Sequence, residues 1–236
     1  MITKGMTTEA VFNEVKKDDY YVLGRMEGLM KKNNKKLKSK AYKNNDILSV
    51  SRYTVPETSD TVVVLAIKDL KTFKGKEYAT INLMYYIITP YDTFITPTID
   101  CINNTVVRYV EYSKHSVDRM KQRLGKDFDT FFREDYIKKN SGIFNLIKYD
   151  YNGDDSEYVA HIGEAFVFVK KNENGLKHIV TTILSTDDLH SNQLLLKLYS
   201  KKGEEARLND IDDLKIVLGE AFLKTLKKSG AIRLNA

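Results

Sequence analysis

The chain has 236 residues, of which 42% are hydrophobic and 30% are charged, with 15 Tyr, 10 Phe and no Trp. This composition allows one or two folded domains with a real core and excludes a chain that is disordered throughout. The formal net charge is +6, and one segment accounts for it, because without the seven lysines between positions 31 and 43 the rest would carry −1. No acidic residue interrupts this cluster, which consists of Lys31, Lys32, Lys35, Lys36, Lys38, Lys40 and Lys43.

Cysteine content and hydropathy point to a cytoplasmic location. Cys101 is the only cysteine, so neither an internal disulfide nor a cysteine-based zinc site can form, and a reducing compartment fits. The N-terminus lacks the apolar core of a signal peptide. The longest apolar run, Ile81 to Ile88, is far shorter than the ~20 residues that span a bilayer. We therefore expect a cytoplasmic protein that does not insert into a membrane.

The first half of the chain is predicted to hold a helix and several strands. Thr7 or Thr8 can cap a helix that reaches Met30, and the lysine-rich segment either extends it or forms a loop. Apolar, β-branched runs and turn signals predict strands at 47–53, 61–68, 78–89 and 105–112, with a turn at 74–76 and an edge strand or loop at 91–96 between two prolines.

The second half is predicted to begin with two helices. Ser113 caps the first, Gly125 ends it, and the second carries Phe128, Phe131 and Phe132 on its inner face. A β-meander over 143–184 follows, with turns at 152–153 and 174–175, a bend or bulge at Gly163 within 158–170, and a strand at 179–184. Helices at 187–199 and 211–226 complete the chain.

This order predicts an α+β fold with antiparallel sheets, an N-terminal helix, a central helix pair and C-terminal helices. Composition does not mark a domain boundary. The best place for a division is the region 90–104, which gives an N-terminal region at 1–104 and a C-terminal domain at 105–236; one continuous domain is the alternative.

The helix after Ser113 carries the most specific chemistry. His115, Arg119 and Arg123 fall within about 80° of one another on one helical face, because each residue advances by roughly 100°. An imidazole that can move a proton beside two guanidinium groups suits an anionic phosphate ligand. The alternative is a solvated polar face, with Asp118 and Glu111 as ion-pair partners.

The other histidines and a possible metal site carry weaker signals. His161 lies just before Gly163 and is the best second imidazole, or else a buried, hydrogen-bonded strand histidine. His178 and His190 are expected at the surface. No spacing of histidine and acidic residues predicts a metal site, the aspartates at 150–155 do not match a calcium loop, and no cofactor motif is present.

Two linked motifs resemble uncharacterised proteins of phages and mobile elements of gut bacteria. The first is a strand leading into Ser-x-His115-x-x-x-Arg119-x-x-x-Arg123, and the second is a meander ending in Thr-Thr182-x-x-Ser. More distantly, the two motifs are similar to the RelE-like toxins, small metal-independent ribonucleases. The resemblance covers at most residues 106–199 and implies an RNA-cleaving site with His115 as acid or base, Arg119 and Arg123 as phosphate ligands, and Thr182 as a supporting hydroxyl. RelE-like toxins are usually shorter and more basic than this near-neutral region.

Two functions follow as hypotheses. The first is a phage or mobile-element protein that binds nucleic acid, RNA more than DNA, through the seven lysines. This protein would also cleave RNA without a metal, by attack of a 2′-hydroxyl on the phosphate while His115 transfers the proton. The second is a non-enzymatic binding or assembly protein, such as a virion component or an inhibitor of a host factor, with the lysines as a solubilising or docking segment. The first requires His115, Arg119 and Arg123 to line a cleft with His161 or Thr182.

Overall fold

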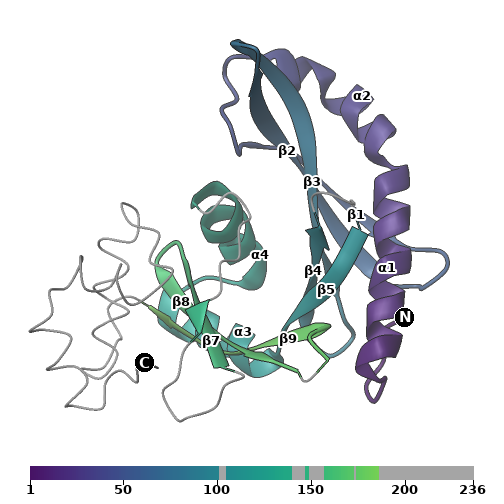
Figure 1. Cartoon of the computed structure of the whole chain (residues 1–236), viewed down its shortest axis with the longest axis vertical. Coiled ribbons are helices and arrows are strands. Elements are labelled where there is room, and N and C mark those ends of the chain that lie inside the picture. Colours follow the sequence, from purple (N-terminus) through teal and green to yellow (C-terminus); the bar gives the residue numbers. More distant parts are fainter. Residues whose placement is uncertain (101–104, 140–146, 149–156, 173, 186–236) are drawn as a thin grey trace, which may run out of the picture.

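The computed structural model describes residues 1–100, 105–139, 147–148, 157–172 and 174–185. One nine-stranded sheet runs through them in the order β1-β2-β3-β4-β5-β9-β8-β7-β6 (Figure 1). The helical elements are α1 (Thr8–Gly24), α2 (Met26–Lys38), α3 (Lys114–Leu124), α4 (Phe128–Phe131) and the π-helical segment η1 (Phe132–Lys139). The strands are β1 (Ile47–Thr54), β2 (Thr61–Phe73), β3 (Lys76–Ile88), β4 (Phe94–Asp100), β5 (Thr105–Tyr112), β6 (Ile147–Lys148), β7 (Glu157–Ile162), β8 (Ala165–Lys171) and β9 (Lys177–Ser185).

The α+β class is therefore confirmed, with two consecutive helices at the N-terminus and a central pair formed by α3 and by α4 with η1. Thr7, Ser113 and Asp127 cap α1, α3 and α4 by accepting from backbone N–H groups, and Gly125 ends α3 at φ +65°. The predicted C-terminal helices, the turn at 152–153 and His190 lie outside the described residues. The division near 104 stays a prediction.

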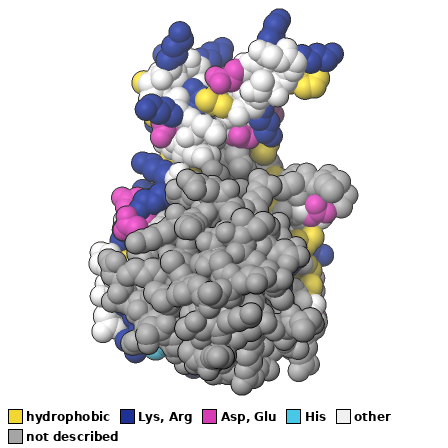
Figure 2. All heavy atoms as spheres, turned by 60° about the vertical axis from the view of Figure 1, so that its left-hand side comes forward, with side chains coloured by type: hydrophobic (Ala, Val, Ile, Leu, Met, Phe, Trp, Pro, Cys, Tyr) yellow, Lys and Arg dark blue, Asp and Glu magenta, His cyan; other side chains and the backbone are white. Residues whose placement is uncertain are grey.

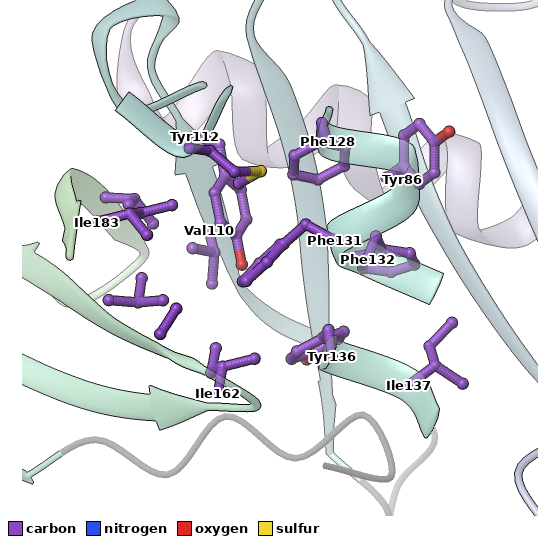
Figure 3. Packing of buried hydrophobic residues seen from close by; sticks show 14 of the residues in the cluster. Tyr86, Val110, Tyr112, Phe128, Phe131, Phe132, Tyr136, Ile137, Ile162 and Ile183 are labelled. Atoms are coloured by element: carbon purple, nitrogen blue, oxygen red, sulfur yellow. The ribbon is translucent and has the colours of Figure 1, made fainter. Parts of the chain in front are cut away.

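Apolar side chains are buried on both faces of the central part of β2, which explains its continuous apolar run. Val62 and Val64 pack beneath α1 and α2, whereas Val63 and Leu65 face the core formed with α3, α4 and η1. Figure 1 shows the two N-terminal helices along one side of the sheet and α4 on the other. Figure 3 shows the second core, where aromatic side chains from β3, β5, α4 and η1 meet.

The sheet is mixed, which corrects the antiparallel expectation. β5 and β9 are parallel from Tyr109↔Lys177 to Tyr112↔Val180, while the other pairs of described strands are antiparallel. A parallel pair needs a long crossover connection. The helices α3, α4 and η1, followed by the strands β6, β7 and β8, provide it.

β4 lies inside the sheet, although its proline suggested an edge strand or loop. It pairs with β3 only at Ile87↔Ile95 and Ile88↔Phe94, whereas its pairing with β5 extends through Pro97 to Asp100. Proline lacks a backbone N–H and is tolerated where one side of a strand has no ladder.

Gly163 forms the turn of a hairpin instead of a bend within one long strand. β7 and β8 are separate strands that close at Ile162↔Ala165, and Gly163 has φ +60°. A Cβ atom there would collide with the side chain of Asp135 in η1, which is 1% exposed. Asp135 forms ion pairs with Lys126 at 2.6 Å and with Lys139 at 3.0 Å. The glycine therefore lets the hairpin approach a buried carboxylate.

Candidate nucleic-acid interface

Helix α2 uses a narrow stripe for packing and leaves its lysines outside. Leu29, Asn33 and Leu37 are buried at intervals of four residues. The Asn33 amide donates to the Leu29 carbonyl at 2.9 Å and to Ser49 Oγ of β1 at 2.8 Å. These contacts attach α2 to the sheet by one side. The lysines of α2 lie on the exposed remainder of the helix: Lys31, Lys32, Lys35, Lys36 and Lys38.

The loop after α2 holds two further lysines beside β2. Lys68 Nζ donates to the Ser39 carbonyl at 2.9 Å, and the Leu70 N–H donates to Asn44 Oδ1 at 2.8 Å. Because these bonds attach the loop to β2, Lys40 and Lys43 are exposed at a defined place next to that strand.

The seven predicted lysines are not equivalent. Lys36 Nζ donates to the Leu48 carbonyl at 2.6 Å, so this ammonium group helps to fasten α2 to β1. Lys31 pairs with Glu27 at 2.6 Å, an exposed contact of small energy. The other five form no ion pair with any residue that the structure describes: Lys32, Lys35, Lys38, Lys40 and Lys43.

The hairpin of β2 and β3 extends beyond its neighbours as a two-stranded ribbon. β1 leaves β2 at Ile47↔Ile67, but the pairing of β2 with β3 continues to Phe73↔Lys76. Lys74 at φ +50° and Gly75 at φ +74° form the two-residue turn, with the two positive φ values that a type I′ turn requires. The predicted turn is thus confirmed, and the ribbon projects at the top of Figure 1.

One face of this ribbon alternates lysine with aromatic rings, a feature that sequence reasoning missed. Lys71 pairs with Tyr78 and Phe73 pairs with Lys76, so strand alternation places all four on the same face. Phe73 is 63% exposed and Tyr78 is 52% exposed. The i, i+2 spacing on both sides of a two-residue turn was the signal that could have revealed this face.

We call residues 26–46 and 68–78 the basic end. They contain eleven lysines and four acidic residues, a surplus of seven positive charges in a chain whose net charge is +6. Figure 2 shows Lys and Arg side chains gathered over the narrow part of the molecule, with hydrophobic side chains among them. Such a concentrated positive field attracts phosphate backbones.

The predicted catalytic residues on α3 are placed differently. His115 is exposed, and Arg119 Nη1 donates to Gln122 Oε1 of its own helix at 2.7 Å. Arg123 Nη1 donates to the Ile183 carbonyl at 2.9 Å. Among the described residues the pairing of β9 with β5 ends at Val180, and this bond gives the Ile183 carbonyl further along β9 a charged donor. Arg123 therefore has a structural role.

His161 and Thr182 do not converge with the α3 side chains. α3 packs on the face of β9 that carries Ile183, as part of the second core. Thr182 follows the other alternation and pairs with Phe168, which belongs to a separate apolar cluster. The His161 ring lies 4.9 Å from the Phe166 ring of that same cluster. His161 and Thr182 thus lie on the face of the sheet opposite α3.

Two further expectations are corrected. His178 is buried, at 2% exposed, instead of lying at the surface. Burial and the charges of Arg108 and Lys171 lower the pKa of His178 to about 4, so its ring is neutral at pH 7. Glu111, considered as a partner for the α3 cations, instead pairs with Lys177 at 2.7 Å.

Comparisons with known proteins yield no relative. No family model matches the chain, and no curated protein or solved structure is significantly similar to it. Within the described ranges no helix combines the length and apolar character needed to cross a bilayer.

Proposed function

We propose that this protein binds nucleic acid through the basic end, with backbone phosphates as the groups contacted. The observation that carries the proposal is the set of exposed lysines at one end of the molecule, of which five from α2 and its loop form no ion pair with described residues. Lys71, Lys74 and Lys76 of the ribbon are exposed at the same end of the molecule, and strand alternation places Lys71 and Lys76 on the sheet face opposite α2.

Phosphate neutralisation explains why lysine suits this surface. Each ammonium group that neutralises a phosphate releases a bound counterion, so affinity falls as salt rises. Exposed lysines on a firmly attached helix and loop meet a flexible polyanion without losing bonds to the protein. The alternative, a docking site for a protein, is less consistent because lysine is depleted from the cores of protein–protein interfaces.

We do not extend the proposal to RNA cleavage. The mechanism based on His115 requires free guanidinium groups at a shared pocket, but Arg123 is bonded to the Ile183 carbonyl. His161 and Thr182 face the other side of the sheet.

Binding is tested by a salt titration with two charge-matched triple variants. In the first, Lys35, Lys38 and Lys43 of the basic end become Gln; in the control, the exposed residues Lys4, Lys121 and Lys138 become Gln. The probe is an oligouridylate RNA of about twelve nucleotides, a length suited to one single-strand binding site. The DNA equivalent is measured in parallel, and tighter binding of the RNA is expected.

At 0.1 M salt we expect the first triple variant to bind about 100-fold more weakly. The slope of log affinity against log salt should become shallower by about 2, because each lost phosphate contact reduces the slope by ~0.7. The control should change affinity by no more than about twofold. Equal losses in the two triples, or a larger loss in the control, would place binding elsewhere and refute the proposal.

A further inference from the structure

We infer that the exposed face of the β2–β3 ribbon is a stacking platform for unpaired bases, so that the ligand class is single-stranded nucleic acid. This inference rests on the proposed function and adds a second recognition element to the lysines. Its residues are Lys71, Phe73, Lys76 and Tyr78, with Lys74 at the turn.

The exposure of the two rings is the first observation. Phe73 and Tyr78 lie at the projecting end of the ribbon, at 63% and 52% exposed, although apolar surface gains free energy when removed from water. Nearer the centre of the sheet, the same face of β2 and β3 is buried at Leu65 and Tyr86. The rings at the tip therefore remain available for a ligand.

The register sets the spacing of the platform. Because Phe73 pairs with Lys76 and Lys71 with Tyr78, each ring has an ammonium side chain directly across the ladder. The two rings are diagonal neighbours, and such positions lie roughly 7–8 Å apart, within reach of aromatic side chains. A strand with two splayed bases can stack one on each ring while its phosphates meet the lysines.

The turn residue adds a cation at the same place. Lys74 Nζ lies 5.4 Å from the centroid of the Phe73 ring. Lys74 occupies a left-handed conformation that asparagine or glycine adopts more readily. A third lysine at the tip thus occupies a position that turn chemistry alone does not favour.

The chemistry selects single strands over duplexes. In a duplex the base faces are covered by neighbouring base pairs, whereas an unpaired base offers its π-face to an aromatic side chain. A ribbon inserted into a duplex groove would read base edges instead. Asp69, the acidic residue on this face, pairs with Lys71 at 3.4 Å, and the remaining cations favour a polyanion.

The test compares ring removal with ring retention on three probes. Phe73→Ala with Tyr78→Ala removes both rings, whereas Tyr78→Phe keeps the ring and serves as the matched control. The probes are the oligouridylate, an RNA duplex of the same length and inorganic polyphosphate, which presents phosphates without bases. Circular dichroism verifies that each variant is folded.

We expect the double alanine variant to bind the oligouridylate at least tenfold more weakly, with changes of no more than about twofold for the duplex and for polyphosphate. Tyr78→Phe should stay within about twofold of the parent on every probe. An unchanged oligouridylate affinity, or an equal loss on all three probes, would overturn the inference.

A direct readout is available because the chain contains no Trp. In Phe73→Trp the indole is the sole tryptophan reporter, and stacking should quench its fluorescence with the oligouridylate but not with polyphosphate. Quenching by both probes, or by neither, would refute stacking. If the lysine triple variant loses affinity but removal of the two rings does not change it, only the stacking inference is refuted. If neither the lysine triple variant nor the ring variants change affinity, the proposed function is refuted as well.

Discussion

The basic end and helix α3 both present clustered cations on a helical face, yet the two clusters are used differently. In α2 the amide of Asn33 and the ammonium group of Lys36 make the bonds to β1, and three other lysines of the helix, Lys32, Lys35 and Lys38, form no ion pair with described residues. In α3 a member of the cation cluster bonds to the sheet, because Arg123 donates to the Ile183 carbonyl, and the N-cap Ser113 donates to the Val180 carbonyl.

The difference follows from where each helix packs. α2 packs on a sheet face through Leu29 and Leu37, and one of its lysines, Lys36, donates to a strand carbonyl, that of Leu48. α3 runs along the part of β9 that follows its described pairing with β5, where a strand carbonyl accepts from a guanidinium group. Similar charge patterns in sequence therefore have different meanings, depending on which backbone groups lie nearby.

The largest expected effect is a loss of stability that differs between a glycine in the body of the molecule, Gly163, and a glycine in the basic end, Gly75. Gly163→Ala should cost about 3 kcal/mol or more of unfolding free energy, because a methyl group would displace the buried, ion-paired Asp135. Gly75 has a similar positive φ, but a Cβ there meets nothing within 4 Å, so Gly75→Ala should cost about 1 kcal/mol. Urea denaturation measures both, and equal losses would contradict this distinction.

The helix layer that carries the basic end should show its own pH dependence. Asp18 in α1 is fully buried, and desolvation together with Asp60 raises its pKa from 3.8 to about 7, although Thr58 donates to it at 2.6 Å. The folded state then binds this proton more tightly than the unfolded state, so the contribution of Asp18 to stability is greatest below about pH 4 and falls as pH rises to about 7.

Asp18→Asn removes this ionisation and should stabilise the protein by about 2 kcal/mol at pH 8, with little gain near pH 4. Urea denaturation at both pH values tests it, with the exposed Asp118→Asn as control. A gain that does not depend on pH would show that Asp18 does not titrate in this window.

The α3 cluster can be tested residue by residue. Arg123→Ala should lower the unfolding free energy by about 1–2 kcal/mol, since the Ile183 carbonyl loses a charged donor, while Arg119→Ala should cost less than about 0.5 kcal/mol. His115→Ala should alter neither stability nor oligouridylate affinity. If the parent cleaves RNA in the presence of a chelator and His115→Ala does not, the predicted catalytic role would be restored.

The smallest effect distinguishes turn stability from binding at the tip of the ribbon. Lys74→Asn should raise the unfolding free energy by about 0.5 kcal/mol, because asparagine accepts the left-handed conformation more readily. It should also weaken oligouridylate binding about threefold to fivefold at 0.1 M salt through the loss of one phosphate contact. Unchanged affinity would remove Lys74 from the interface.

Local features were predictable where neighbouring residues determine them. The caps at Thr7 and Ser113, the terminating Gly125 and the turn at Lys74–Gly75 depend on short-range hydrogen bonds and φ values, and the structure contains all of them. The apolar runs of β2 and β3 likewise indicated strands, because β-branched side chains favour that conformation.

Sequence by itself thus determined most local elements in the described part of the chain and the presence of one concentrated positive charge. Tertiary structure alone decided that β5 and β9 pair in parallel, that Arg123 donates to a carbonyl of β9, and that His161 and Thr182 lie across the sheet from α3. It also brought the lysines of α2 and the aromatic ribbon to the same end of the molecule. The physical reason is that periodicity assigns a side chain to a face, whereas long-range pairing decides what that face meets.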